Sequence, residues 1–144
     1  RVLTIAYTDS IREEKGGTYG VSVQSELDRN SKPTTLIKIG FRTDPAKYEM
    51  LMPIVYRQIE NIANNGPLAE SMAKVKTYLL KAYQQNAITN NYWDYVIYNN
   101  LRHGVDFHTG YEDLLNGLTA QDIQQIAKDM LKSNRRIEIT MMPE

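Results

Sequence analysis

The fold of this chain is decided by one stretch, Ile11-Arg12-Glu13-Glu14-Lys15-Gly16-Gly17-Thr18-Tyr19-Gly20-Val21-Ser22-Val23. A lysine followed by two glycines is typical of a helix end, because a cation favours the negative end and glycine adopts positive φ without strain. Beyond the glycines, residues on one side of the chain alternate with those on the other at the period of a strand. We therefore expect a helix over residues 1–14, a turn, and a strand over Thr18–Leu27.

Turn-forming residues follow at 28–33, and apolar residues alternate again over Thr34–Thr43. The two alternating segments predict an antiparallel hairpin with one buried face. The rest of the chain has mainly helical periodicity. We expect helices beginning near Pro45, Pro67, Tyr92, Tyr111 and Thr119, and a final strand over Arg136–Met141.

Local signals support two of these helices. Asp44 is a good N-cap and Pro45 suits the first helical position. Thr119 and Asp122 resemble a capping box. Pro53 lies inside the first of these helices, and we expect it to kink that helix or break it in two.

The order of elements predicts an α+β fold, with an antiparallel or mixed sheet and helices packed on one face. A chain of 144 residues is long enough to bury one core, and we expect a single domain over residues 1–144. Three strands are few for this much helix, and the chain begins with Arg1 instead of Met. We therefore expect the domain to be truncated at its N-terminus.

Composition excludes several functions. Lys+Arg 17 against Asp+Glu 17 gives no net charge, which argues against a nucleic-acid partner. The absence of cysteine excludes disulfides, thiol nucleophiles and Cys-ligated metals. No apolar run approaches the ~20 residues that span a bilayer. These observations leave the cellular compartment unassigned.

No residue set predicts catalysis by itself. His103 and His108 do not have the spacing of a helical zinc pair, and we expect both to be surface or packing residues. The acidic pairs Glu13-Glu14 and Glu26…Asp28 are typical of a solvated face. Five tyrosines of the middle helices are expected at the core boundary, with a peptide-binding surface as the alternative. They are Tyr78, Tyr83, Tyr92, Tyr95 and Tyr98.

The Ile11–Val23 stretch resembles a signature of the second, non-zinc half of the M16 (pitrilysin/insulinase-like) zinc metallopeptidases. In that half, a helix ending in an Arg-Glu pair runs through a glycine turn into a strand that begins with Tyr. Further segments with similar placement extend the resemblance over essentially the whole chain. They are Thr43-Asp44-Pro45, Asn65-Gly66-Pro67, Lys74-Val75-Lys76, the segment 118–124 and Met142-Pro143-Glu144.

The resemblance implies a metallohydrolase-type (LuxS/MPP-like) fold and a role in peptide-bond hydrolysis. In such enzymes one half holds zinc through a His-x-x-Glu-His motif, and the other half helps to bind the peptide. This chain has no such motif, so the resemblance implies no catalytic residue and no metal ligand here. Zinc is expected in a catalytic domain, which lies on the same chain or in a partner subunit.

The family's Arg and Tyr fall on Arg12 and Tyr19, which are thereby implied to bind the peptide substrate. A phenol donates a hydrogen bond to a carbonyl or oxyanion, and a guanidinium offers a planar fork of donors. Gly20, which fits the family pattern loosely, is implied to allow close approach of a substrate backbone. Without the resemblance, Arg12 is read as a partner of a nearby surface acid, and Tyr19 as an ordinary strand aromatic.

Two other functions remain open at this point. One is a catalytically inactive structural or assembly subunit that keeps the M16-like fold. The other is a stand-alone peptide-binding module.

Overall fold

The structure is a computed structural model, and it describes residues 1–13, 20–29 and 34–142. The side chains of Arg12 and Glu13 lie outside the described part. The elements, in order, are α1 (Val2–Tyr7), the π-helix η1 (Thr8–Glu13), β1 (Val21–Asp28), β2 (Thr34–Phe41), the 3₁₀-helix η2 (Pro45–Lys47), α2 (Tyr48–Asn65), α3 (Ala69–Asn86), α4 (Asn90–His103), α5 (Tyr111–Gly117) and α6 (Ala120–Ser133).

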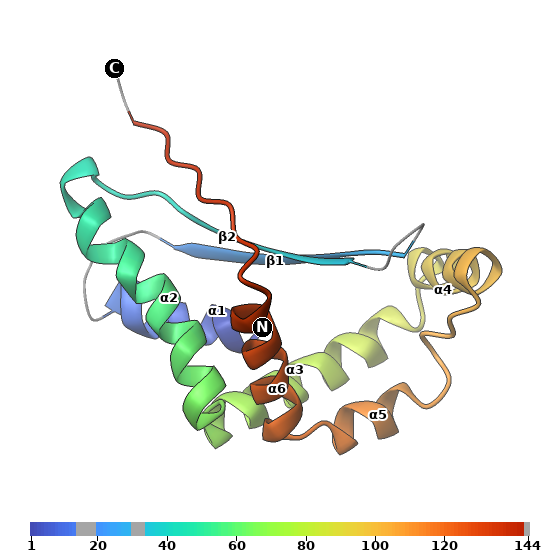
Figure 1. Cartoon of the computed structure of the whole chain (residues 1–144). Coiled ribbons are helices and arrows are strands. Elements are labelled where there is room, and N and C mark those ends of the chain that lie inside the picture. Colours follow the sequence, from blue (N-terminus) through green and yellow to red (C-terminus); the bar gives the residue numbers. More distant parts are fainter. Residues whose placement is uncertain (14–19, 30–33, 143–144) are drawn as a thin grey trace.

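The described strands form one antiparallel hairpin, β1–β2, whose register pairs Val21 with Phe41 and Asp28 with Thr34. Figure 1 shows α1, α6 and most of α2 beneath this hairpin. The molecule is therefore an α+β fold with helices on one face of a small sheet, as the sequence predicts.

Two groups of buried apolar side chains join the hairpin to these helices. One lies between α1, η1, the hairpin and the first half of α2, and it contains Tyr7, Ile11, Leu51, Ile54 and Val55. The other lies between the second half of α2 and α6, and it contains Ile59, Ile62, Ala63 and Ala127. Ile39 of β2 packs against both groups, so the two are continuous through the hairpin.

The buried face of the hairpin is confined to the end at which β1 begins. Val21 and Phe41 are partly buried and pack on the first core group. At the other end, Leu27 and Leu36 are about half exposed. The predicted one-sided burial is therefore present at one end of the hairpin and absent at the other.

The N-terminal helix differs in geometry from the prediction. A regular helix was expected over residues 1–14, but the α-helix ends at Tyr7 and continues as a π-helix from Thr8 to Glu13. Helical spacing of 3.6 residues did not single out Tyr7, yet its side chain is completely buried. Of the predicted strand Thr18–Leu27, Thr18 and Tyr19 lie outside the described residues, and β1 begins at Val21.

Of the two effects predicted for Pro53, the break does not occur, because α2 runs continuously from Tyr48 to Asn65, and the kink stays a prediction. Pro53 is solvent-exposed. The carbonyl that loses its hydrogen bond to the missing proline N–H, that of Glu49, belongs to an exposed residue, so water can replace that bond. The predicted start is confirmed, since the Asp44 side chain accepts a 2.9 Å hydrogen bond from the Ala46 N–H.

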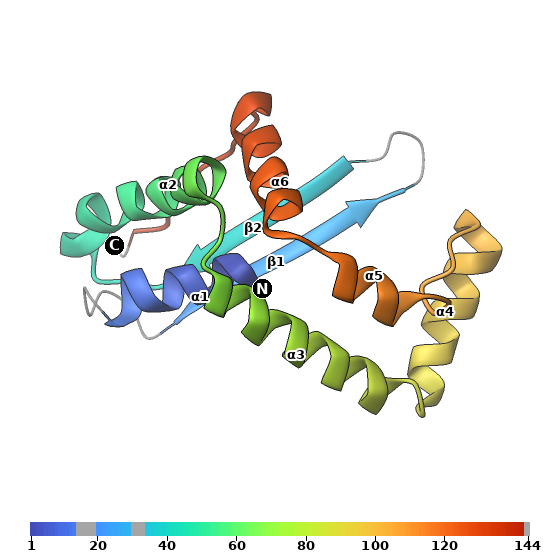
Figure 2. The same cartoon turned by 90° about the horizontal axis from the view of Figure 1, so that it is seen from below.

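The last residues of α3, together with α4 and α5, form an arm that extends from the hairpin core, and α4 lies across the far end of α3 (Figure 2). We call residues 83–117 the arm. The helix expected to begin near Tyr92 is α4, which runs from Asn90 to His103. The Thr119 and Asp122 capping box at the start of α6 is confirmed.

The predicted strand Arg136–Met141 was wrong, because this segment has no assigned strand structure. It runs from the end of α6 past the hairpin as an extended coil (Figure 1). Ile137, Ile139 and Met141 are 90%, 83% and 92% exposed. Alternation alone predicted a strand, but no strand in the described part of the chain pairs with it.

Candidate functional site

The segment that bears Arg12 is fixed firmly to the core. Ile11, its neighbour, is completely buried, as is Tyr7 one turn earlier. The Tyr7 hydroxyl donates a 3.0 Å hydrogen bond to the Val55 carbonyl of α2. Burial raises the pKa of Tyr7 well above its usual range. The backbone of Arg12 is therefore held in place by α2.

The π-helical turn adds a second constraint on this segment. The hydroxyls of Thr8 and Ser10 donate to the carbonyls four residues earlier, at 2.8 and 2.6 Å. Side chains of this kind satisfy carbonyls that a widened helix leaves without a regular partner. Short π-helical turns are rare in proteins, and those that occur often lie at functional sites. Arg12 lies within this turn.

Gly20 lies at the other side of the glycine turn, immediately before β1. It is exposed, and a Cβ placed there would meet no atom of the described residues within 4 Å. Its φ is outside the left-handed region, so its backbone conformation does not require glycine. Within the described residues, there is room beside Gly20 for the close approach that the resemblance implies for this position.

The structure brings the two ends of the glycine turn together, because η1 contacts β1. Figure 1 shows both at the end of the hairpin where β1 begins. Tyr19, Gly16 and Gly17 lie outside the described residues, as does the side chain of Arg12. The substrate-binding roles of Arg12, Tyr19 and Gly20 thus stay predictions.

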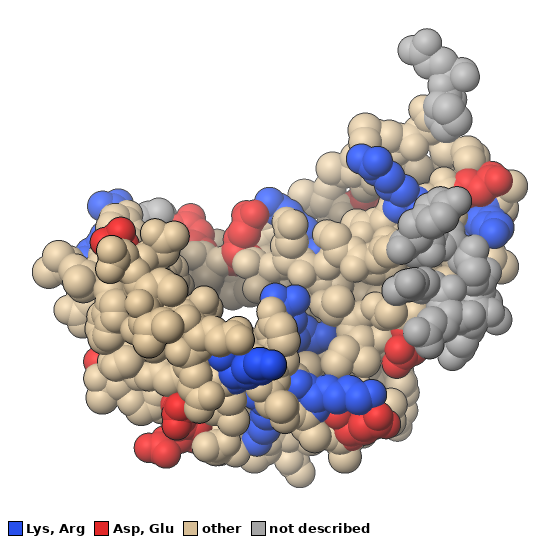
Figure 3. Space-filling model, turned by 180° about the vertical axis from the view of Figure 1, so that it is seen from behind, with Lys and Arg blue, Asp and Glu red and all other residues tan. Residues whose placement is uncertain are grey.

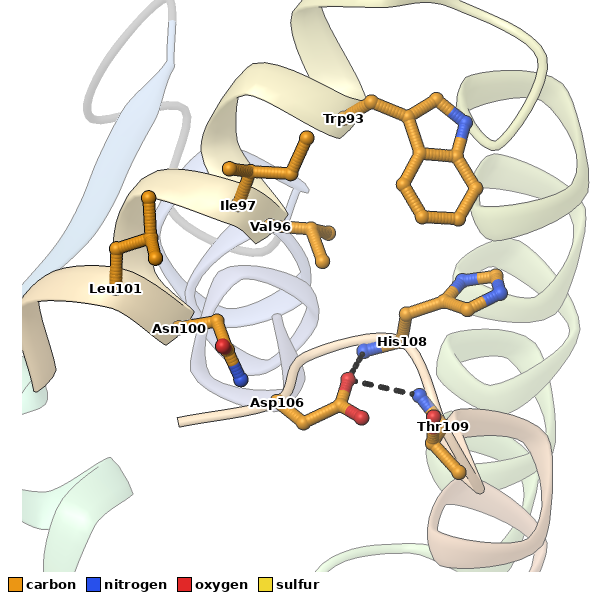
Figure 4. A pocket seen from close by; sticks show the side chains of 8 residues that line it. All are labelled: Trp93, Val96, Ile97, Asn100, Leu101, Asp106, His108 and Thr109. Carbon is orange, nitrogen blue, oxygen red and sulfur yellow. Dashed lines mark hydrogen bonds between the residues drawn. The ribbon is translucent and has the colours of Figure 1, made fainter. Parts of the chain in front are cut away.

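A second candidate site, which the sequence did not single out, lies on the arm. A groove of about 270 Å³ is formed by α4 and the loop before α5. Figure 4 shows its eight lining residues, with Trp93 and His108 on one side and Ile97 and Leu101 of α4 on the other. The residues are Trp93, Val96, Ile97, Asn100, Leu101, Asp106, His108 and Thr109.

One acidic residue shapes the loop of this groove. Asp106 accepts hydrogen bonds from the backbone N–H groups of His108 and Thr109, at 2.8 and 3.0 Å. Hydrogen bonds from Thr109 and His108 lower the Asp106 pKa to about 2, so its carboxylate is charged at neutral pH. The loop is thereby fixed with the His108 ring toward Tyr83 and Tyr92.

His108 is enclosed by aromatic rings. Its Nδ1 lies 3.1 Å from the hydroxyls of both Tyr83 and Tyr92. The ring centroid of Trp93 is 4.6 Å from that of His108. His108 is therefore a packing residue, as expected, and it organises two of the five tyrosines assigned to the core boundary. The signal that sequence reasoning missed is the convergence of residues 83, 92 and 108, which only tertiary structure supplies.

The described residues contain no group of three or more His, Asp or Glu side chains that could hold a metal ion. Of the acidic pair Glu26 and Asp28, Glu26 forms a 2.6 Å salt bridge with Lys38 on the solvated surface of the hairpin. Lys and Arg are interspersed with Asp and Glu over the face shown in Figure 3. No helix in the described part of the chain is both long and apolar enough to cross a bilayer.

Comparison with known protein families assigns this chain to a family. The family model described as the Peptidase M16 inactive domain matches residues 5–79, which is just over half of the chain. The chain belongs to the M16 peptidase family. The matched region contains η1, the hairpin and α2, and thus both ends of the glycine turn.

A solved structure supports the fold. The periplasmic protease PqqL from Escherichia coli matches 88% of this chain with a TM-score of 0.70 and 18% sequence identity. The chain spans only 14% of the length of PqqL. At this identity the similarity shows the fold alone. The search of curated proteins found no significant match.

Proposed function

We propose that this M16 inactive domain is the non-catalytic, substrate-binding half of a zinc metalloendopeptidase. Residues 1–144 form part of one domain in this proposal. The catalytic zinc belongs to a separate domain, on the same chain or in a partner subunit, and this chain contributes contacts to the peptide substrate.

The match of residues 5–79 to the inactive domain is the observation that carries the proposal. The described residues contain no donor set that fits a zinc site, so the proposal assigns this chain no zinc ligand. Of the two histidines, His108 has its Nδ1 against two tyrosine hydroxyls.

In the proposal, Tyr19 donates a hydrogen bond to the substrate carbonyl and Arg12 binds backbone carbonyls or a terminal carboxylate. The firm attachment of η1 to α2 supports this assignment, because a binding group is effective only when its backbone is held in place. The room that the described residues leave beside Gly20 supports approach of a peptide at the same end of the hairpin.

The proposal is tested in the whole protein by Tyr19→Phe. Loss of a hydrogen-bond donor to the reacting carbonyl should lower kcat/KM for peptide hydrolysis by about 10²-fold. Tyr95→Phe is the matched control, because Tyr95 is an exposed tyrosine of the arm. Equal kcat/KM for Tyr19→Phe and the unmodified protein would contradict the role of Tyr19.

The chain alone provides a separate test. Residues 1–144 with added zinc should not hydrolyse peptides, because a suitable ligand set is absent from the described residues. Chelator-sensitive turnover by the purified chain would contradict the non-catalytic assignment. If the whole protein also lacks turnover and the sequence upstream has no His-x-x-Glu-His, the chain is instead part of a structural subunit.

A further inference from the structure

The π-helical turn η1 is fixed to the first core group on both sides of Ser10. Tyr7 lies three residues before Ser10 and Ile11 one residue after it, and both side chains are completely buried. The Tyr7 hydroxyl also donates a hydrogen bond to the Val55 carbonyl of α2. Because these contacts lie inside the core, they do not depend on what covers the surface of the chain.

Ser10 is a buried polar residue within this turn, with 5% of its surface exposed. Its hydroxyl donates a 2.6 Å hydrogen bond to the Ala6 carbonyl. In a regular α-helix this carbonyl accepts from the backbone N–H of residue 10, whereas in a π-helix each N–H bonds five residues back. The serine hydroxyl thus occupies the acceptor that an α-helical turn uses, and it favours the wider turn.

Thr8 makes the same kind of contact at the start of η1. Its hydroxyl donates a 2.8 Å hydrogen bond to the Thr4 carbonyl. Thr8 is only partly buried, and it lies farther from Arg12 than Ser10 does. Of the two hydroxyls, that of Ser10 should therefore have the larger influence on Arg12.

The geometry of η1 sets the direction in which the backbone of Arg12 leaves the core. Successive residues of an α-helix are turned by about 100° around its axis, because 3.6 residues make one turn. A π-helical turn contains more residues, so a change from π to α geometry rotates the residues of that turn relative to α1. Arg12 lies two residues after Ser10 within η1, and such a rotation would redirect it.

We propose that Ser10 is a positioning residue for the peptide substrate: its hydroxyl holds η1 in the π-helical form, and this form sets the backbone direction from which Arg12 reaches the peptide. The inference rests on the proposed function, because it acts through the substrate contact assigned there to Arg12. Ser10 is buried and does not touch the substrate itself.

The experiment compares Ser10→Ala with the unmodified whole protein in steady-state peptide hydrolysis. Alanine is a good helix former, so the variant lacks the hydroxyl and keeps a helical residue. KM should rise about fivefold while kcat stays within about twofold, because Arg12 binds the peptide away from the reacting carbonyl. Partial unfolding would instead lower the amount of active enzyme, and hence kcat, without raising KM.

Two further variants serve as comparisons. Thr8→Val removes the other hydroxyl and should raise KM by less, about twofold. Ser133→Ala is the matched control, because the Ser133 hydroxyl donates a 2.8 Å hydrogen bond to a carbonyl of its own helix, that of Met130 in α6. It should leave KM unchanged, since α6 does not bear Arg12.

A double-mutant cycle tests whether Ser10 acts through Arg12. Arg12→Ala alone should raise KM about tenfold or more, and Ser10→Ala should add nothing in that background. A crystal structure of the Ser10→Ala protein gives a readout besides activity. In it, residues 8–13 should form a regular α-helix.

Three results would overturn the inference and leave the proposed function intact. The first is an unchanged KM for Ser10→Ala when Arg12→Ala raises KM. The second is an effect of Ser10→Ala that is equally large in the Arg12→Ala background. The third is a π-helical turn that persists in the Ser10→Ala protein. If Arg12→Ala itself leaves KM unchanged, the substrate contact of Arg12 is wrong, and the inference fails with it.

Discussion

The hairpin core and the arm are stabilised in different ways. In the hairpin core, Tyr7, Ile11 and Leu51 are completely removed from water. In the arm, only Val96, Asn99 and Leu115 are buried, and none of them completely. The arm depends instead on ring contacts around His108 and on the stacking of Tyr95 against Phe107.

The difference in burial between the hairpin core and the arm agrees with the range of residues that the family model matches. Residues 5–79 contain the whole first core group and most of the second, whereas the arm begins beyond them. Burial of apolar area is the dominant favourable term in folding, so the hairpin core should determine the stability of the chain. The arm should open locally at lower free energy, because it has few buried contacts.

The largest expected effect is that of Leu51→Ala in the hairpin core. Removal of a completely buried leucine side chain leaves a cavity, and we expect the free energy of unfolding to fall by about 2–5 kcal/mol. The measurement is urea denaturation followed by far-UV circular dichroism.

The matched control is Leu114→Ala in the arm, where the side chain is 71% exposed. It should change the free energy of unfolding by no more than about 0.5 kcal/mol. Similar losses for the two variants would mean that the arm and the hairpin core are one cooperative unit, contrary to the contrast drawn above.

The parts of the fold that could be predicted from sequence are those with local causes. Asp44 and the Thr119–Asp122 capping box act within a few residues, and both are present as predicted. The hairpin was also predictable, because alternation and turn residues adjoin each other along the chain.

The failures have non-local causes. The effect of Pro53 depends on which side of α2 faces water, and the pairing of residues 136–141 depends on a neighbouring strand. The burial of Tyr7 escaped prediction because it depends on contact with α2, which lies far along the chain. For the candidate site, Arg12, Tyr19 and Gly20 came from a family resemblance, since no spacing of these residue types specifies peptide binding.

A smaller effect in the hairpin core is expected from Tyr7→Phe. This change removes the hydrogen bond to the Val55 carbonyl while keeping the ring, and should cost about 1–2 kcal/mol at neutral pH. Equilibrium unfolding of both proteins between pH 7 and about pH 11 measures it. A loss below the error of the measurement would show that the hydroxyl contributes nothing to the core.

The same pair of proteins should differ in pH dependence. Burial raises the Tyr7 pKa above its ordinary value of 10.0, so the unfolded chain releases this proton at lower pH than the folded chain. Above about pH 10 the unfolded state therefore binds fewer protons, and the stability of the unmodified chain falls as pH rises. Tyr7→Phe lacks this term, so its disadvantage should shrink with rising pH; a constant difference would contradict the burial of the phenol.

The smallest effect is expected in the arm, from His108→Ala. Trp93 is the only tryptophan of the chain and contacts the His108 ring, so its fluorescence reports on the arm. Loss of the His108 ring contacts should lower the free energy of arm opening by about 0.5–1 kcal/mol. The measurement is the unfolding transition followed by Trp93 fluorescence. The transition followed by far-UV circular dichroism, which the hairpin core dominates, should move less.

His103→Ala provides the matched control, because it removes the other histidine, whose ring lies at a longer distance of 6.4 Å from Tyr98. It should leave the Trp93 transition unchanged. If His108→Ala shifts the fluorescence and circular dichroism transitions by the same amount, the arm does not open separately, and a single cooperative unit extends from the buried Leu51 to the rings around His108.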